Sequence, residues 1–240
     1  MITVHDLSPN VEVLAGSGAA AAAPEVERAV ATAWQAERAR RPTLFDGTLF
    51  SVDRFSAARI AGRFVPYRYL VGQRARPELF ESLRVRPLAV SGLLACADGI
   101  VFGRRAAGLT DDSGMWELVP SGGVDAQAAD SSGRVDLRRQ IMVELAEEVG
   151  LAPGDISATE FFCAVEDSVS HTIDIGIALS SPLAADAVRA RHARAGHAEY
   201  PEIQIIAGDG IADFVAGLGD GLLAASRALL ARRGLIPKIY

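Results

Sequence analysis

The stretch VELAEEVGL, residues Val143–Leu151, decides the fold, because it has the pattern of the second half of a helix that ends at a glycine. Within it Glu144, Glu147 and Glu148 fall at positions i, i+3 and i+4, so their carboxylates share one face of the helix. Like charges at these spacings destabilise a helix by roughly 0.2–0.5 kcal/mol per pair. An isolated E-x-x-E-E is also typical of a solvated helix face, so the surrounding sequence must decide between that interpretation and a site for a divalent cation.

The sequence before this helix runs as a strand into a glycine-rich turn. The segment MWELVPSGGV, residues 115–124, leads through this turn toward a helix predicted from about Val135 to Val149. From apolar alternation and turn residues we predict strands at residues 88–96, 100–104, 158–167, 170–180 and 202–208, and helices at residues 184–195 and 221–233. This order indicates an α/β fold in which helices pack on a mixed sheet.

The first part of the chain has the pattern of an N-terminal extension. A helix is predicted over residues 25–41, and short strands and turns over residues 44–73. We therefore divide the chain into an α+β extension packed on the core, residues 1–86, and a core domain with a C-terminal helix, residues 87–240.

Composition and charge narrow the class of protein. Half of the 240 residues are apolar, which is enough for a sizeable core, and the net charge of −6 argues against a nucleic-acid partner. The longest apolar run is interrupted by Asp98, so we expect neither a membrane span nor a signal peptide. Cys96 and Cys163 lie in apolar runs, and we expect both to be buried, reduced thiols of a cytoplasmic protein.

The glycine-rich turn and the acidic helix together resemble the Nudix box, G-x5-E-x7-R-E-U-x-E-E-x-G-U, where U is a bulky aliphatic residue. The tail of this pattern is matched by Glu144, Leu145, Glu147, Glu148, Gly150 and Leu151. The similarity covers about residues 88–179. It implies a Nudix-type α/β/α sandwich with a mixed sheet and an N-terminal extension, and it makes residues 87–240 a catalytic domain with pyrophosphohydrolase activity.

The box departs from the family pattern at three positions. Val143 replaces the arginine, Val135 replaces the first glutamate, and Ala129 stands at the opening glycine. The loop VDAQAADSSGR, residues 124–134, resembles an insertion of about six residues. We expect Val143 to be buried on the flank of the helix.

In the family, the missing arginine and glutamate orient the metal-binding acids. Their paired absence indicates a remodelled site rather than a damaged one, because removing both partners leaves no uncompensated buried charge. Asp136, with Arg138 or Arg139, is the candidate replacement.

The resemblance also implies a set of site residues. Mg²⁺ or Mn²⁺ would be held by Glu144, Glu147, Glu148 and the carbonyl of Gly123. Glu144 and Glu148 would be the catalytic carboxylates, with Glu148 the first candidate for the general base. Glu199 and Glu202, in the segment HAEYPEIQ, are the alternative bases.

Three further residues are candidates for binding the substrate. Arg104 and Arg105, at the end of a predicted strand, would clamp a phosphate, and Trp116 would stack on a base. Surface arginines and a core tryptophan are the alternative interpretations.

The atypical box, the segment TLFDGTLFSVDRF at residues 43–55 and the chain length are similar to the Nudix branch that hydrolyses UDP-sugars. This weaker resemblance implies a small nucleoside diphosphate substrate, such as UDP-glucose, that yields a nucleoside monophosphate and a sugar 1-phosphate. The alternative is a catalytically idle Nudix domain that binds a nucleotide ligand or a protein partner. A homodimer is left open.

Overall fold

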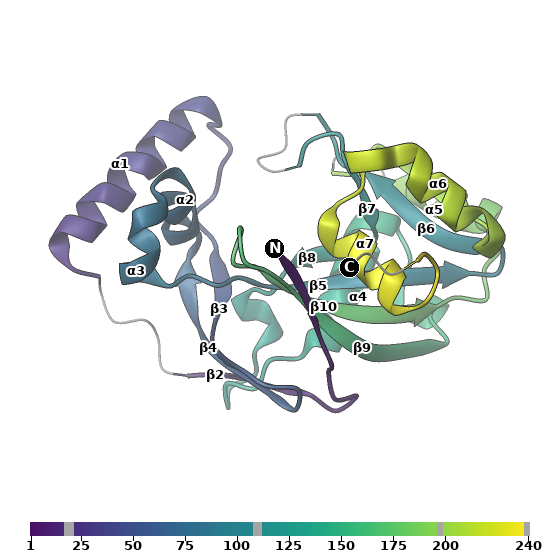
Figure 1. The fold of residues 1–240 in the computed structure, drawn as a ribbon, viewed down its shortest axis with the longest axis horizontal. Coiled ribbons are helices and arrows are strands. Elements are labelled where there is room, and N and C mark those ends of the chain that lie inside the picture. Colours follow the sequence, from purple (N-terminus) through teal and green to yellow (C-terminus); the bar gives the residue numbers. More distant parts are fainter. Residues whose placement is uncertain (17–21, 108–111, 196–198, 238–240) are drawn as a thin grey trace.

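The computed structural model describes residues 1–16, 22–107, 112–195 and 199–237. In these residues eight strands form one mixed sheet, in the order β1-β9-β10-β5-β6-β11, with β7 beside β6 and β8 beside β5 (Figure 1). The strands are β1 (Ile2–His5), β5 (Leu88–Cys96), β6 (Gly99–Arg104), β7 (Trp116–Leu118), β8 (Ser121–Gly123), β9 (Ala158–Asp167), β10 (Ile173–Ser180) and β11 (Glu202–Ile206).

Helices cover both faces of this sheet, and each face has its own core cluster. On one face Ile175 and Ile177 of β10 pack with Ile141 and Leu145 of the acidic helix. On the other, Leu93 and Cys163 pack with Leu229. The first face holds α4 (Leu137–Glu144), the π-helical turn η3 (Leu145–Val149) and α5 (Ala185–Ala195); the second holds α6 (Ile211–Leu218) and α7 (Ala224–Arg232). The short 3-10 turns are η4 (Pro153–Asp155), η5 (Gly208–Gly210) and η6 (Gly219–Gly221).

This arrangement confirms the predicted α/β/α sandwich with a mixed sheet. The predicted hairpin is present, since β9 and β10 pair antiparallel, and β10 also pairs parallel with β5. The predicted helix from Val135 to Val149 begins two residues later, because Asp136 caps α4 by accepting hydrogen bonds from the amides of Arg138 and Arg139.

The N-terminal region forms a second, three-stranded sheet with its own helices. Its strand order is β2-β4-β3, and its apolar cluster is centred on Val30, Val65 and Leu70. Its elements are β2 (Glu12–Ala15), α1 (Pro24–Arg40), β3 (Thr48–Phe55), β4 (Arg59–Pro66), α2 (Tyr67–Ala75), η1 (Pro77–Leu79) and α3 (Phe80–Leu83). The domain division at residue 86 stays a prediction, and β1 crosses it by joining the large sheet beside β9.

The loop that departs from the Nudix box ties the two parts together. It contains the 3-10 turn η2 (Ala126–Ala128) and is closed by Asp130, which accepts hydrogen bonds from the amides of Ser132 and Arg134. The Gly133 carbonyl then accepts a bond from the Ala15 amide at 2.7 Å, and Arg134 pairs with Glu12 at 2.8 Å. The extra residues of this loop therefore dock on the small sheet.

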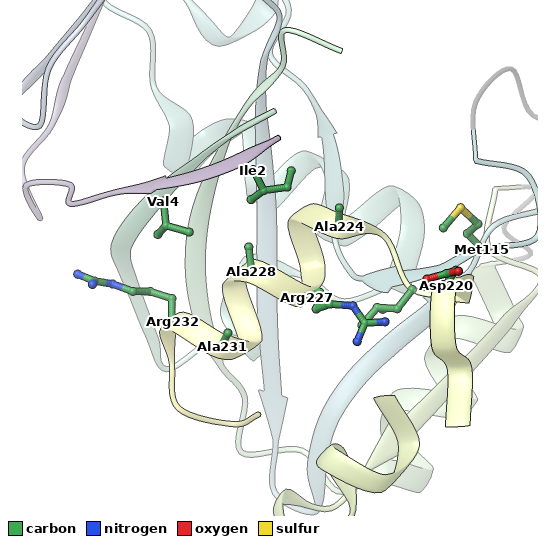
Figure 2. A pocket seen from close by; sticks show the side chains of 10 residues that line it. Ile2, Val4, Met115, Asp220, Ala224, Arg227, Ala228, Ala231 and Arg232 are labelled. Carbon is green, nitrogen blue, oxygen red and sulfur yellow. The ribbon is translucent and has the colours of Figure 1, made fainter. Parts of the chain in front are cut away.

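A cavity of about 660 Å³ lies between β1 and α7, away from the acidic helix (Figure 2). Ile2 and Val4 of β1 face the small side chains of Ala224, Ala228 and Ala231 across it. None of the box carboxylates lines it.

Two further expectations concern the thiols and the membrane. Cys96 and Cys163 are both free and buried, as predicted. Within the described ranges, no helix combines the length and the apolar character needed to cross a bilayer.

Candidate active site

The three glutamates of the acidic helix lie in three different environments. Glu148 is buried, with 4% of its surface exposed, Glu144 is half-buried and Glu147 is exposed. The change from α4 to the π-helical turn η3 falls directly after Glu144. Single π turns inside helices are frequent at functional sites. We expected all three carboxylates to share one accessible face, and the burial of Glu148 corrects that expectation.

Strand β8 holds the two inner glutamates from the opposite side. The Ser121 amide donates a hydrogen bond to Glu148 Oε2 at 2.8 Å. Gly122 makes room for Glu144, because a Cβ at this position would overlap the Glu144 carboxyl group. The glycine-rich turn is thus needed for the close approach of backbone to carboxylate.

Burial changes the protonation of these carboxylates. It raises the pKa of Glu144 to about 7, against the opposing effect of a hydrogen bond from Gln140 and with a further rise from the charge of Glu147. Burial likewise raises the pKa of Glu148 well above its usual range, and the charges of Glu144 and Glu199 add to the rise. Carboxylates with this perturbation are typical of functional sites and of sites that a cation neutralises.

The described part of the chain contains no preformed cluster of three or more His, Cys, Asp or Glu side chains that could hold a metal ion. What the structure brings together is the pair Glu144 and Glu148 beside β8, where the charge of Glu144 adds to the rise in the pKa of Glu148. Oxygen donors of this kind fit Mg²⁺ or Mn²⁺, which commonly takes one or two carboxylates and completes its shell with water and substrate phosphates. The roles of Glu147 and Gly123 as ligands stay predictions.

The missing box arginine is explained by the surroundings of its position. Val143 is 43% exposed, so our expectation that it is buried was wrong, whereas Val135 is 5% exposed and lies in the core. The two positions therefore lie in different environments, one at the surface and one in the core. Gln140 supports the acids instead: its Nε2 donates to Glu144 Oε1 at 2.6 Å, one turn along the helix.

One of the three proposed replacements for the lost pair, Arg139, lines a cavity with Glu144. Asp136 caps α4, and Arg138 donates to the Thr159 carbonyl and lies over the ring of Phe161. Arg139 lines a small cavity of about 250 Å³ together with Glu144 and Glu147.

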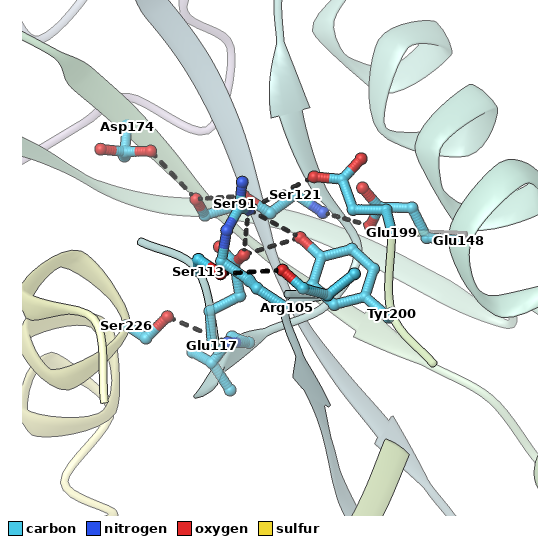
Figure 3. Close-up of polar contacts among 12 residues, drawn as sticks. Ser91, Arg105, Ser113, Glu117, Ser121, Glu148, Asp174, Glu199, Tyr200 and Ser226 are labelled. Atoms are coloured by element: carbon cyan, nitrogen blue, oxygen red, sulfur yellow. Dashed lines mark hydrogen bonds and ion pairs between the residues drawn. The ribbon is translucent and has the colours of Figure 1, made fainter. Parts of the chain in front are cut away.

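A second polar cluster, formed by Arg105, Glu117, Glu199 and Tyr200, lies near Glu148 (Figure 3). Arg105 donates to Glu117 Oε1 at 2.5 Å, Tyr200 donates to the same oxygen at 2.7 Å, and Arg105 pairs with Glu199 at 3.3 Å. Burial would lower the pKa of Arg105, but the carboxylate of Glu117 outweighs it and keeps the guanidinium charged. Burial also raises the pKa of Glu199.

A cavity of about 620 Å³ connects these groups, and we call it the central cavity. Its floor comes from β5, β8 and β10, and one wall comes from α2 of the N-terminal region. The wall from α2 consists of Tyr67, Leu70 and Arg74. The other lining residues used below are Ser91, Arg105, Glu117, Ser121, Gly122, Gly123, Asp167, Ser170, Thr172, Asp174 and Glu199.

The remaining predicted site residues fall into two groups. Arg105 and Glu199 line the central cavity, and their roles as phosphate clamp and alternative base stay predictions. Arg104 and Glu202 pair with each other on the exposed side of β6 and β11, at 3.5 Å. Trp116 is 8% exposed and packs edge-on against Phe214, which agrees with the core tryptophan that was the alternative interpretation from the sequence.

Several residues of this site were missed from the sequence. Gln140 could have been found, because it lies one helical turn before Glu144 on the same face. Asp174 also carried a signal, as a charged residue within the alternating strand TIDIGIALS. Glu117 and Tyr200 carried none, since only the fold brings them together.

No family model matches the sequence, and no curated protein matches it. Among solved structures, the chain is similar to a bifunctional NMN adenylyltransferase/ADP ribose pyrophosphatase from Francisella tularensis, at 15% identity and a TM-score of 0.45, over 69% of this chain and 45% of that one. The NUDIX domain of Shewanella oneidensis NrtR, solved with ADP ribose, gives 16% identity and a TM-score of 0.42, over 68% and 94% of the two chains. An ADP-ribose pyrophosphatase from Streptococcus suis gives 13% identity and a TM-score of 0.35, over 63% and 89%.

One of these structures is that of a NUDIX domain, the family whose box the acidic helix resembles. The chain spans less than half the length of the first of them.

Proposed function

We propose that this protein is a Nudix-type pyrophosphohydrolase that uses Mg²⁺ or Mn²⁺ to hydrolyse a nucleoside diphosphate linked to another moiety, most simply a nucleotide sugar such as UDP-glucose. The observation that carries the proposal is the pair of desolvated carboxylates, Glu144 and Glu148, held against β8, whose residues Ser121, Gly122 and Gly123 line the central cavity. Glu147, on the exposed side of the same helix, and the Gly123 carbonyl are the proposed further ligands.

The charge of the central cavity explains why a cation is needed. Glu117, Glu199 and Asp174 line it, and two of these acids already flank Arg105. A diphosphate placed here without a counter-ion would be repelled, since charges in a desolvated site are screened weakly. The bound cation would neutralise phosphate charge and make a water a better nucleophile.

The residues of the chain would divide the remaining work. Arg105, fixed by Glu117 and Tyr200, would hold a phosphate oxygen. Water attacks one phosphorus, the anhydride P–O bond breaks, and the second phosphate leaves with the bonding electrons. Glu199 is better placed than Glu148 to accept the proton of the water, because it lines the central cavity, its pKa is raised toward neutrality and it is not one of the two inner ligands.

A metal-dependent screen tests this proposal. The purified chain is incubated with nucleoside diphosphate compounds, including UDP-glucose and ADP-ribose, in Mg²⁺, in Mn²⁺ and in EDTA, and the products are identified. We expect a nucleoside monophosphate and a phosphorylated second moiety, with no turnover in EDTA. Turnover that persists in EDTA would overturn the proposal.

A catalytically idle Nudix domain is the second candidate function. The observation that favours it is the absence, among the described residues, of a preformed three-acid cluster. Calorimetric binding of a nucleotide without turnover in either cation would support this candidate instead.

The proposed partners and setting follow from the sequence. The net charge of −6 supports a small-molecule substrate rather than a nucleic acid. Two buried free cysteines support a reducing, cytoplasmic setting. The proposal includes no membrane partner, and it is compatible with either a monomer or a homodimer.

A further inference from the structure

Asp174 is a carboxylate of the central cavity that the proposed hydrolysis does not use. It alternates along β10 with Ile173 and Ile175, which face the core under α4, so Asp174 projects from the opposite face of the sheet. Ser91, 4% exposed on the neighbouring strand β5, donates to Asp174 Oδ1 at 3.1 Å (Figure 3). In the part of the chain that the structure describes, Asp174 is paired with no cation.

A short row of polar groups connects Asp174 to the glutamate pair. The Ser91 hydroxyl lies 3.4 Å from the Ser121 hydroxyl, and the Ser121 amide donates to Glu148 at 2.8 Å. The Ser91 hydroxyl therefore lies between the Asp174 carboxyl and the hydroxyl of Ser121 on β8, the strand that holds the two glutamates. A group bound over Asp174 would be a direct neighbour of a phosphate bound at Gly122 and Gly123.

The charge around Asp174 excludes a phosphate from this end of the cavity. Burial, with smaller contributions from the charges of Glu117 and Asp167, raises the pKa of Asp174 to about 7, against the opposing effect of the hydrogen bond from Ser91. A phosphate here would meet these acids, whereas at the other end it meets Arg105, which Glu117 and Tyr200 hold in place. The diphosphate therefore belongs beside β8, and an uncharged part of the substrate belongs over Asp174.

The chemistry of the floor suits hydroxyl groups. Besides Ser91 and Ser121, the side chains of Ser170 and Thr172 line the cavity near Asp174. Sugar hydroxyls both donate and accept hydrogen bonds, so they can satisfy a carboxylate and serine hydroxyls together. A hydrogen bond to a buried carboxylate is stronger than one between neutral groups, and leaving the carboxylate unpaired is costly.

We propose that Asp174 is a specificity-determining residue that accepts hydrogen bonds from vicinal hydroxyls of the substrate, with Ser91 as its positioning residue. The inference rests on the proposed function for the placement of the diphosphate. The hydroxyls come from the sugar linked to the diphosphate or from the ribose of the nucleotide.

Binding measurements test this proposal separately from catalysis. Calorimetry with Mg²⁺ compares Glu148→Gln, used to prevent turnover, with the double variant that also carries Asp174→Asn. We expect the second substitution, which keeps the shape and removes the charge, to weaken UDP-glucose binding about tenfold or more. Unchanged affinity, or no measurable binding of UDP-glucose, would overturn the proposal.

Three smaller probes then identify the source of the hydroxyls. If the sugar supplies them, Asp174→Asn weakens binding of glucose 1-phosphate and leaves UMP unchanged. If the ribose supplies them, the variant weakens UMP but not dUMP. If the variant loses equal affinity for UMP and for dUMP, Asp174 contacts the base rather than a hydroxyl group, and this result would also overturn the proposal.

Asp167→Asn is the matched control. Asp167 lines the same cavity, but its carboxylate already accepts bonds from the Val169 amide at 2.9 Å and the Ser170 hydroxyl at 3.0 Å. The Asp167→Asn variant should bind UDP-glucose with an affinity within about twofold of the parent. If it loses as much affinity as Asp174→Asn, the loss comes from the negative charge of the cavity in general, and the assignment of Asp174 is contradicted.

Kinetics separates this proposal from the proposed function. In the hydrolysing chain, Asp174→Asn should raise KM for UDP-glucose and leave kcat within about threefold. Binding through Asp174 without any hydrolysis would refute the proposed function alone. Hydrolysis with identical KM in the variant would refute the hydroxyl assignment alone.

Discussion

Gln140 offers the sharpest test of how this site manages without the box arginine. Its amide donates to Glu144 at 2.6 Å, its side chain is 6% exposed, and the bond holds down a pKa that burial raises. Gln140→Leu keeps the volume and removes the donor. A hydrogen bond to a charged group contributes about 1.5–3 kcal/mol, and about 1.4 kcal/mol corresponds to a tenfold change in an equilibrium constant. The affinity of the Gln140→Leu variant for the cation should therefore fall about 10–100-fold.

Titration of the hydrolysis rate with Mg²⁺ measures this change, and calorimetry with Mn²⁺ checks it without catalysis. The expected result is a cation requirement shifted to higher concentration, with a rate at saturating Mg²⁺ that recovers most of the wild-type value. Gln127→Leu is the control, because Gln127 lines the same small cavity and should leave the titration unchanged. An unaltered Mg²⁺ titration in Gln140→Leu would refute the idea that this glutamine replaces the arginine.

Three further predictions follow from single positions. Val143→Arg should change the free energy of unfolding by no more than about 0.5 kcal/mol, because the side chain is exposed, and a large loss in thermal melts would show that Val143 packs in the core. Gly122→Ala should displace the flexible carboxyl end of Glu144, so it should lower Mg²⁺-dependent kcat/KM about tenfold or more with little change in Tm. Wild-type activity in this variant would contradict the close approach of β8 to Glu144. Asp174 has a pKa of about 7 in the folded protein and a lower pKa in the unfolded chain, so the wild-type free energy of unfolding falls as pH rises from about 4 to 7. Asp174→Asn lacks this titration. Between pH 5 and pH 8 its free energy of unfolding, measured in urea, should therefore rise by about 1–2 kcal/mol relative to that of wild type. A relative stability that does not change with pH would mean that Asp174 is freely hydrated.

The central sheet could be predicted from the sequence because its strands alternate apolar residues. Ile173, Ile175 and Ile177 identify β10 and the face that packs on α4. The strand β1 was not predicted, because four residues carry too little periodicity, and its place beside β9 depends on long-range pairing. Helix α6 was likewise missed, since it follows a strand and a Gly-Asp-Gly turn that by itself indicates a loop.

For the site, the sequence identified the acidic side chains but not how far each one is buried. The spacing of Glu144 and Glu148 placed them on one helix face, but burial of Glu148 depends on the approach of Ser121 from β8. The exposure of Val143 was also mispredicted, because an apolar residue next to the apolar stripe of a helix can face either the core or the solvent. Asp174 gains its character only from a cavity whose wall comes from the N-terminal region.

Hydrolysis of UDP-glucose in ¹⁸O-labelled water, followed by phosphorus NMR with and without Mg²⁺, tests the central claim most directly. The carboxylate pair is expected to hold the cation that drives attack of water on the diphosphate. Wild type should therefore place one labelled oxygen in a single phosphate product, only when Mg²⁺ is present, and Glu148→Gln should be at least about 100-fold slower while still unfolding cooperatively. Label incorporation in EDTA, or an undiminished rate in folded Glu148→Gln, would contradict the account.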